Sequence, residues 1–248
     1  MNITLIGGGQ LGKQLYRTLI DQVEVKLFQW VVRSAKEGKT IEGVPIVNKI
    51  NKINKIDLYL LAISDKAISV VAEKLPADSF VVHTAGGVPM NRICQKRAGV
   101  LYPIQTFSEG RYINFSEVPI GLESKNDQDL PLLKKLAKGL GSRYFTMNSK
   151  QREQLHLAAV LVNNFTNYFF TEAAVICKEN NLPFDLLKPL IKETAIKLDV
   201  LSPQNAQTGP AIRKDQETIT KHLESIQNPR LHEIYKILTS AIQKNNEQ

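Results

Sequence analysis

Apolar residues follow two different patterns along this chain of 248 residues. In the first part, short apolar runs with strand character alternate with segments in which apolar residues recur at helical spacing. Strands are predicted at residues 3–6, 23–32, 58–63, 79–82, 100–102 and 143–147, and helices after the first strand and at residues 66–75 and 130–140. This alternation predicts an α/β domain over residues 1–148, with a parallel sheet and helices packed against it.

Residues 149–248 show helical patterns, apart from one loop. The first predicted helix runs from about residue 150 to 180 behind Ser149, which we expect to cap it, and its middle is apolar almost all the way round. One small domain can hardly cover such a helix, so we predict an all-α second domain that forms a homodimer around it. Further helices are expected at residues 182–201, as one helix or a pair bent around Pro189, and from Pro229 onward.

Three glycines lie between the first predicted strand and the first predicted helix with the spacing GxGxxG. The first lets the chain turn sharply, the second has no side chain to keep the backbone away from phosphates, and the third lets the helix pack closely on the strand. Unpaired N–H groups at the helix start then face an anion. This predicts a dinucleotide-binding (Rossmann) domain, with a glycine-rich turn that binds nothing as the alternative. The predicted cofactor contacts are Gly7, Gly9, Gln10, Leu11 and Gly12.

The end of the second predicted strand bears on the choice of cofactor. A site that prefers NAD usually has Asp or Glu there, about 20 residues after the glycines, to bind the ribose hydroxyls. This chain has Arg33 and Ser34 instead. A guanidinium beside a hydroxyl suits the additional phosphate of NADP, because it can bind two phosphate oxygens at once. We therefore predict NADP as the cofactor, with an ordinary solvent-exposed loop arginine as the alternative.

Three further strand ends carry small or hydrogen-bonding residues. In an open α/β sheet the carboxyl ends of the strands meet at the ligand crevice, so these residues are expected beside cofactor and substrate. The predicted cofactor contacts are Ala62, Ile63, Ser64 and Thr84, and the predicted substrate contacts are His83, Gln105 and Thr106. His83 suits a proton donor, but a histidine at a strand end can equally be a hydrogen-bonded structural group. Asp65 is expected to cap the following helix.

Polar residues interrupt the apolar part of the long predicted helix. At about 100° per residue, Asn163 and Asn167 fall on either side of His156 and form one stripe with it, and Asn164 directly follows Asn163. Buried polar groups need partners. The stripe therefore either pairs with other helices or across a dimer interface, or it faces the cofactor crevice, with His156 as proton donor and an asparagine holding the substrate.

Residues 202–215 form the loop, with almost no apolar periodicity and many turn-forming residues. A loop of this length is often functional, and Arg213 is its best candidate for binding an anionic substrate group. Asp215 is expected to cap the helix that contains Thr218 and His222.

Composition and charge narrow the class of protein. The net charge is +8, and most of the excess lies in residues 1–148, which hold 20 basic and 13 acidic residues. An anionic cofactor explains part of this excess, whereas no basic stripe with interleaved aromatic residues points to a nucleic acid. No apolar run approaches the ~18 residues of a membrane span, and no leader precedes the first strand. We therefore expect a cytoplasmic enzyme, and because the two cysteines form no CxxC pair, no metal site.

Seven segments together resemble a known group of proteins. They are GGGQLG at 7–12, RS at 33–34, LLAISD at 60–65, VVHTAG at 81–86, LYPIQTFS at 101–108, HLAAVLVNNF at 156–165 and TGPAIRKD at 208–215. The chain resembles Rossmann-like oxidoreductases with a C-terminal helical domain of unassigned function, DUF2520. These are distant relatives of pyrroline-5-carboxylate reductase and of the 6-phosphogluconate and β-hydroxyacid dehydrogenases. The resemblance spans nearly the whole chain and implies an α/β Rossmann domain followed by an all-α domain.

The resemblance also implies a reaction, the NADPH-dependent reduction of a small 2-oxo acid, with 2-dehydropantoate (ketopantoate) reduced to pantoate as the specific expectation. The β-hydroxyacid dehydrogenases carry a lysine four residues before a catalytic asparagine, but here Ala159 and Val160 occupy those positions. His156 is then the expected proton donor, Asn163 or Asn164 orients the carbonyl, and Arg213 binds the carboxylate. An imine reductase and a non-catalytic NADPH sensor are the alternatives.

Overall fold

The computed structural model describes residues 1–245. The chain forms two compact units, Met1–Asn164 and a second that begins at Phe165, and each is described by itself. The expected domain boundary between residues 148 and 149 stays a prediction. Among the described residues, no helix combines the length and apolarity needed to cross a membrane.

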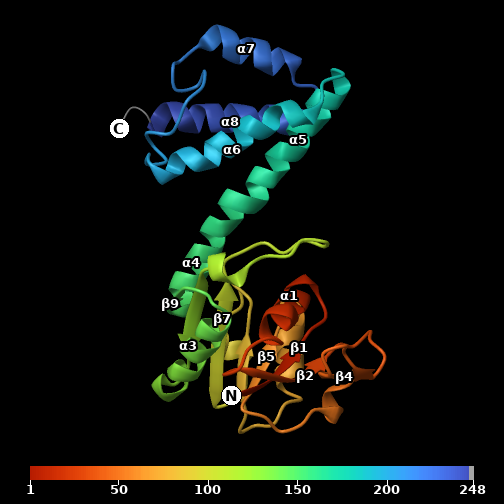
Figure 1. Cartoon of the computed structure of the whole chain (residues 1–248). Helices are drawn as coiled ribbons and strands as arrows, with labels where there is room; N and C mark the ends of the chain where they lie inside the picture. Colours follow the sequence, from red (N-terminus) through yellow and green to blue (C-terminus); the bar gives the residue numbers. More distant parts are fainter. Residues whose placement is uncertain (246–248) are drawn as a thin grey trace. The chain divides into compact units, whose positions relative to one another are not determined.

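The first unit is built on one twisted sheet of nine strands within the described residues, in the order β3-β4-β2-β1-β5-β6-β7-β8-β9 (Figure 1). Neighbouring strands run parallel from β4 through β2, β1, β5 and β6 to β7, as expected for an α/β domain. The antiparallel pairs are β3 with β4 and β7 with β8, and β9 runs parallel to β8. The strands are β1 Asn2–Ile6, β2 Lys26–Val31, β3 Gly38–Lys39, β4 Pro45–Val47, β5 Leu58–Leu61, β6 Phe80–His83, β7 Arg97–Pro103, β8 Ile120–Ser124 and β9 Tyr144–Thr146.

Helices cover both faces of this sheet because its central strands are apolar on both sides. Every residue of β5 and β6 is buried, as the continuous apolar pattern predicts. Alternate strand residues belong to two core clusters, one with α1 Gln10–Leu19 and α3 Leu130–Gly139, the other with α2 Ile68–Ala72. Short 3₁₀ turns complete the unit at Ile50–Lys52, Asp65–Ala67, Met90–Arg92, Phe115–Glu117 and Asp127–Asp129.

Two local predictions for the first unit were wrong. Ser64, not Asp65, occupies the cap position of the turn after β5, and its side chain makes no cap hydrogen bond. Asn148 caps the helix α4 Ser149–Ala159 through a capping box with Gln151, so Ser149 is the first helical residue instead. The strands β3, β4 and β8 were not predicted.

The second unit is helical, as expected. Its elements are α5 Thr166–Glu179, a 3₁₀ turn at Phe184–Leu187, α6 Lys188–Ile196, a second turn at Lys197–Asp199, α7 Gln216–Ser225 and α8 Pro229–Asn245. Pro189 lies in the first turn of α6, where its missing N–H does no harm, so it begins a helix and does not bend one.

The long predicted helix is not α-helical throughout. Between α4 and α5, residues Val160–Phe165 form a π-helix, with hydrogen bonds to the fifth residue along. A uniform rotation of about 100° per residue therefore does not hold between His156 and Asn167, and the predicted stripe of three side chains rests on a wrong assumption. π-Helical turns are rare and are frequent at functional sites.

Candidate functional site

The glycine turn after β1 is packed so tightly that only glycine fits at two of its positions. Gly7 has φ +134°, and a Cβ there would overlap the carbonyl oxygen of Ala62. A Cβ on Gly12 would overlap the Gly7 carbonyl, so the start of α1 lies directly on the turn. A Cβ on Gly9, by contrast, would meet no atom within 4 Å. Gly9 thus presents bare backbone to open space, which is what a pyrophosphate requires.

The direction of the strand order reverses at this turn. From β1 the chain adds β2 and β4 on one side, and β5, β6 and β7 on the other. Such a switch point opens a crevice outside the carboxyl ends of the strands, where ligands of open α/β sheets bind. Thr84 borders it after β6, and its N–H and hydroxyl both donate to the Leu61 carbonyl, at 3.2 and 3.1 Å. The predicted cofactor contacts therefore lie along this edge of the sheet.

Arg33 and Ser34 follow β2 and are exposed. In the part of the chain that the structure describes, no hydrogen bond or ion pair engages the Arg33 side chain. The nearby carboxylate of Glu37 is bound by Lys52 at 2.7 Å, which lowers the pKa of Glu37. Arg33 thus keeps its charge available at the position where an NADP phosphate is expected.

His83 ends β6 and is completely buried. Its Nδ1 accepts a hydrogen bond from the Ala85 N–H at 3.2 Å, while no partner for Nε2 lies within the described residues. Burial, together with the nearby Arg152 charge, lowers its pKa to about 3, so the ring is neutral. The geometry gives His83 a structural role in the turn, and its predicted contact with substrate stays untested.

A buried ion pair holds α4 against the carboxyl ends of the strands. The Nε of Arg152 donates to the Glu123 carboxylate on β8 at 3.0 Å, and the Arg152 side chain is 0% exposed. Its Nη1 donates to the carbonyls of Gly86 and Ala85, at 2.6 and 3.2 Å. Arg152 therefore holds the turn after β6 in place. Without its guanidinium, the Glu123 carboxylate and the carbonyls of Ala85 and Gly86 would lose these hydrogen bonds inside the protein.

His156 lies four residues after Arg152 on α4 and packs against the same turn after β6. Its Nδ1 is 3.2 Å from the hydroxyl of Tyr102 on β7, and the two rings meet edge to face, with centroids 5.9 Å apart. A Cβ on Gly86 would lie 2.6 Å from that Nδ1, and a Cβ on Gly87 3.3 Å from the ring carbon Cδ2. The predicted proton donor thus stands beside bare backbone at the edge of the sheet where the crevice lies.

The remaining residues predicted to take part in catalysis or to bind substrate are exposed. Asn163 and Asn164 lie on the π-helix, where the Asn163 amide donates to Asn164 at 3.4 Å. Gln105 and Thr106 follow β7, and the Gln105 side chain accepts from the Thr106 N–H at 2.8 Å. Two others, Asn167 on α5 and Arg213 on the loop, belong to the second unit, so their place in a common site stays a prediction.

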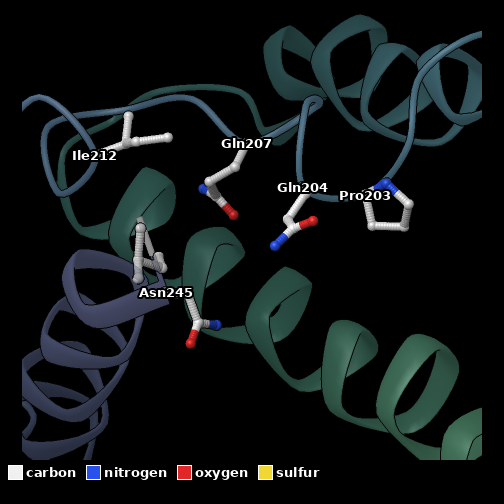
Figure 2. A pocket seen from close by; sticks show the side chains of 6 residues that line it. Pro203, Gln204, Gln207, Ile212 and Asn245 are labelled. Atoms are coloured by element: carbon white, nitrogen blue, oxygen red, sulfur yellow. The ribbon is translucent and has the colours of Figure 1, made fainter. Parts of the chain in front are cut away.

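The loop before α7 lines a hollow of its own in the second unit. Gln204 and Gln207 extend their amides into this space, and Asn245 on α8 also lines it (Figure 2). Arg213 does not line it. The prediction for Asp215 is confirmed, since its carboxylate accepts from the Thr218 N–H at 3.1 Å and caps α7. These hydrogen bonds with Thr218 lower the pKa of Asp215.

Sequence reasoning missed three residues of the first-unit network, Tyr102, Glu123 and Arg152. Tyr102 lies inside the motif LYPIQTFS, directly before the predicted strand-end residues. Arg152 is a charged residue in the run that leads into the apolar helix, where exposure is the ordinary expectation. Nothing in their spacing along the chain shows that they meet.

Comparison with known proteins identifies relatives over the whole chain. The model of the domain of unknown function DUF2520 matches residues 118–242. A solved structure from Bacteroides fragilis, described as a candidate NADP oxidoreductase, is 35% identical, with 98% of each chain covered and a TM-score of 0.84. A Thermotoga maritima protein is 20% identical over 99% of this chain and 100% of its own, with a TM-score of 0.73.

Pyrroline carboxylate reductase of Plasmodium falciparum, solved with NADP bound, is 12% identical over 98% of both chains, with a TM-score of 0.63. The likeness to this reductase and to the Thermotoga protein shows the fold alone. No curated protein sequence matches the chain.

Proposed function

The chain belongs to the DUF2520 family, and from this premise we propose that it is an NADP-dependent oxidoreductase that reduces a small 2-oxo acid, with 2-dehydropantoate as substrate. The observation that carries the proposal is the juxtaposition of the glycine turn with a histidine at one edge of the sheet. Gly7 and Gly12 tolerate no Cβ, and His156 lies beside the turn after β6. The relative from Bacteroides fragilis, described as a candidate NADP oxidoreductase, supports the choice of reaction class.

The residues present fit a dinucleotide. Gly9 leaves the pyrophosphate position open, α1 has no side-chain cap to compete for its first N–H groups, and Arg33 offers a free charge for the NADP phosphate. When bound, NADPH supplies the hydride. The buried Thr84 and the clamped turn at Ala85 and Gly86 keep the neighbouring backbone in place.

The reaction needs a proton donor and groups that hold the substrate. We assign the donor role to His156, which gives its proton to the alkoxide oxygen as it develops. Asn163 or Asn164 on the π-helix orients the carbonyl, and Arg213 binds the carboxylate. Two copies of the chain form a homodimer through the helical unit in this proposal.

The experiment is oxidation of NADPH by the purified protein with 2-dehydropantoate and pyrroline-5-carboxylate offered in parallel. We expect turnover with the oxo acid and a His156→Ala variant whose kcat is about two to four orders of magnitude lower. Turnover with the imine alone would make the protein an imine reductase. NADPH binding without oxidation on either substrate would indicate a sensor, and an unchanged kcat in His156→Ala would exclude the donor role.

A further inference from the structure

The Tyr102 hydroxyl is the polar group that contacts the ring of His156. The phenol is buried, at 7% exposed, and no second hydrogen-bond partner for it lies in the described part of the chain. We infer that Tyr102 is a positioning residue that fixes the rotation and tautomer of His156, so that Nε2 carries the proton to be delivered. This inference rests on the proposed reductase function and deepens it.

The chemistry of the two groups favours a hydrogen bond in which the Tyr102 hydroxyl donates and Nδ1 of His156 accepts. Burial raises the pKa of Tyr102, so its O–H stays protonated at neutral pH and needs an acceptor. The lone pair of a neutral imidazole is that acceptor when the ring proton sits on the other nitrogen. A hydroxyl that donates to Nδ1 across the 3.2 Å contact places the proton of the neutral ring on Nε2.

The backbone of Gly86 and Gly87 also packs against the His156 ring, and Gly86 packs against the Tyr102 ring as well. A Cβ on Gly86 would lie 2.6 Å from Nδ1 of His156 and 2.8 Å from the Tyr102 ring, so both rings contact this glycine directly. A Cβ on Gly87 would lie 3.7 Å from Nε2, so no side chain covers that edge from Gly87. Arg152 holds the carbonyls of Ala85 and Gly86 and thereby the surface on which the ring rests.

The contact serves both protonation states of the ring. When Nδ1 takes up a second proton from solvent, the Tyr102 hydroxyl rotates and accepts from it, so Nε2–H keeps its direction. During reduction the doubly protonated ring is the acid: its Nε2–H bond breaks, the electron pair stays on Nε2, and the proton forms the O–H bond of the alcohol. The ring is left neutral with its proton on Nδ1, which donates to the Tyr102 hydroxyl. Solvent then restores the proton to the ring.

The test compares Tyr102→Phe with Tyr235→Phe. Tyr235 makes the same kind of pair, with its hydroxyl 2.8 Å from Nδ1 of His222 and the rings edge to face, in the second unit. Each variant loses one hydroxyl of a Tyr–His pair and keeps the aromatic ring. Melting temperatures of both variants establish that the proteins are folded.

The first readout needs neither cofactor nor substrate. In the ¹⁵N spectrum of the wild-type protein above its histidine titrations, we expect Nδ1 of His156 near the unprotonated limit and Nε2 near the protonated limit. In Tyr102→Phe the two shifts should move toward each other, because the donor that selects the tautomer is gone, while Tyr235→Phe leaves them unchanged. Unchanged shifts in Tyr102→Phe, or a wild-type ring protonated at Nδ1, would overturn the inference.

The second readout is turnover of 2-dehydropantoate with NADPH. Tyr102→Phe should lower kcat about ten- to a hundredfold, part of the contribution of the general acid itself, and leave both KM values within about twofold. Tyr235→Phe should retain wild-type kcat. An equal kcat in Tyr102→Phe and wild type would also overturn the inference. If the wild-type protein reduces no substrate, the proposed function fails, and the nitrogen shifts still decide the role of Tyr102.

Discussion

The two units of the chain differ in where they keep their apolar side chains. In the first unit, two clusters enclose the sheet on both faces, and the central strands are fully buried. In the second unit, the buried apolar residues among those described are Cys177, Ala206, Ala211, Ile219 and Leu231. Large apolar side chains there stay exposed, among them Leu186 at 66% and Ile176 at 45%.

The two units should therefore draw their stability from different sources. A unit that buries its own apolar surface is stable at any concentration, whereas exposed apolar surface of this extent marks a place where another molecule binds. The second unit therefore supports the proposed homodimer, and its stability should rise with protein concentration. The predictions below test this contrast, beginning with the largest effect.

The buried Glu123–Arg152 pair should show how much the first unit depends on internal contacts. Arg152→Met should lower its free energy of unfolding by about 3–5 kcal/mol, because the Glu123 carboxylate then stays buried without its counter-charge. Arg230→Met removes an exposed arginine from the second unit and should cost less than about 0.5 kcal/mol. Urea unfolding followed by circular dichroism measures both.

The double variant Glu123→Gln, Arg152→Met separates the charge from the packing. It should be more stable than the sum of the two single losses predicts, since no unpaired charge is left inside. Equal losses for Arg152→Met and Arg230→Met would contradict the structural role of the pair and the contrast between the units.

The pH dependence of stability should reveal the burial of His83 in the first unit. The pKa of His83 is lowered from its usual 6.5 to about 3, so the unfolded chain binds a proton below pH 6.5 that the folded unit does not. Stability is therefore highest above pH 6.5 and falls by about 1.4 kcal/mol per pH unit as the pH decreases toward 3. At pH 4.5 the loss amounts to about 2–3 kcal/mol.

Thermal unfolding of the wild type and of His83→Gln between pH 4.5 and 7.5 measures this slope. His83→Gln should reduce the slope by the equivalent of about one proton, whatever the stability of the variant itself. An unchanged slope in His83→Gln would mean that this ring takes up its proton equally well in the folded state.

The architecture of the first unit could be predicted because its signals are local. The apolar run at residues 58–63 is long enough to mark a strand buried on both faces, and the spacing of Gly7, Gly9 and Gly12 reflects contacts within one turn. The strand β8 was missed because five residues that include a glycine and a glutamate carry a weak pattern. The π-helix was missed because a change from α- to π-type hydrogen bonding alters the backbone but leaves no mark in the composition of an apolar segment.

The candidate site was predictable only in part, for a related reason. The residues predicted to contact the cofactor directly follow strands, so the topology of the sheet places them. Tyr102 and His156 are 54 positions apart in the sequence, and their contact depends on how α4 packs against β7. Arg152 ties α4 to the sheet, but its burial requires Glu123, which lies on β8, and β8 was not predicted.

The smallest expected effect concerns the exposed apolar surface of the second unit. Ile176→Glu places a charge on α5 within the proposed dimer interface and should weaken association about ten- to thirtyfold, or about 1–2 kcal/mol. Val70→Glu is the matched control, because Val70 is also a β-branched residue, 51% exposed, but lies on α2 of the first unit. Sedimentation equilibrium over a range of concentrations gives the dissociation constants.

We expect a dimeric mass for the wild type and for Val70→Glu, and a mass that falls toward the monomer on dilution for Ile176→Glu. The melting temperature of Ile176→Glu should also depend more steeply on concentration, because stability gained from association is lost when the subunits separate. A monomeric wild type with a melting temperature independent of concentration would show that the second unit is stable with its apolar side chains in water. The contrast between the units would then describe their surfaces and not the origin of their stability.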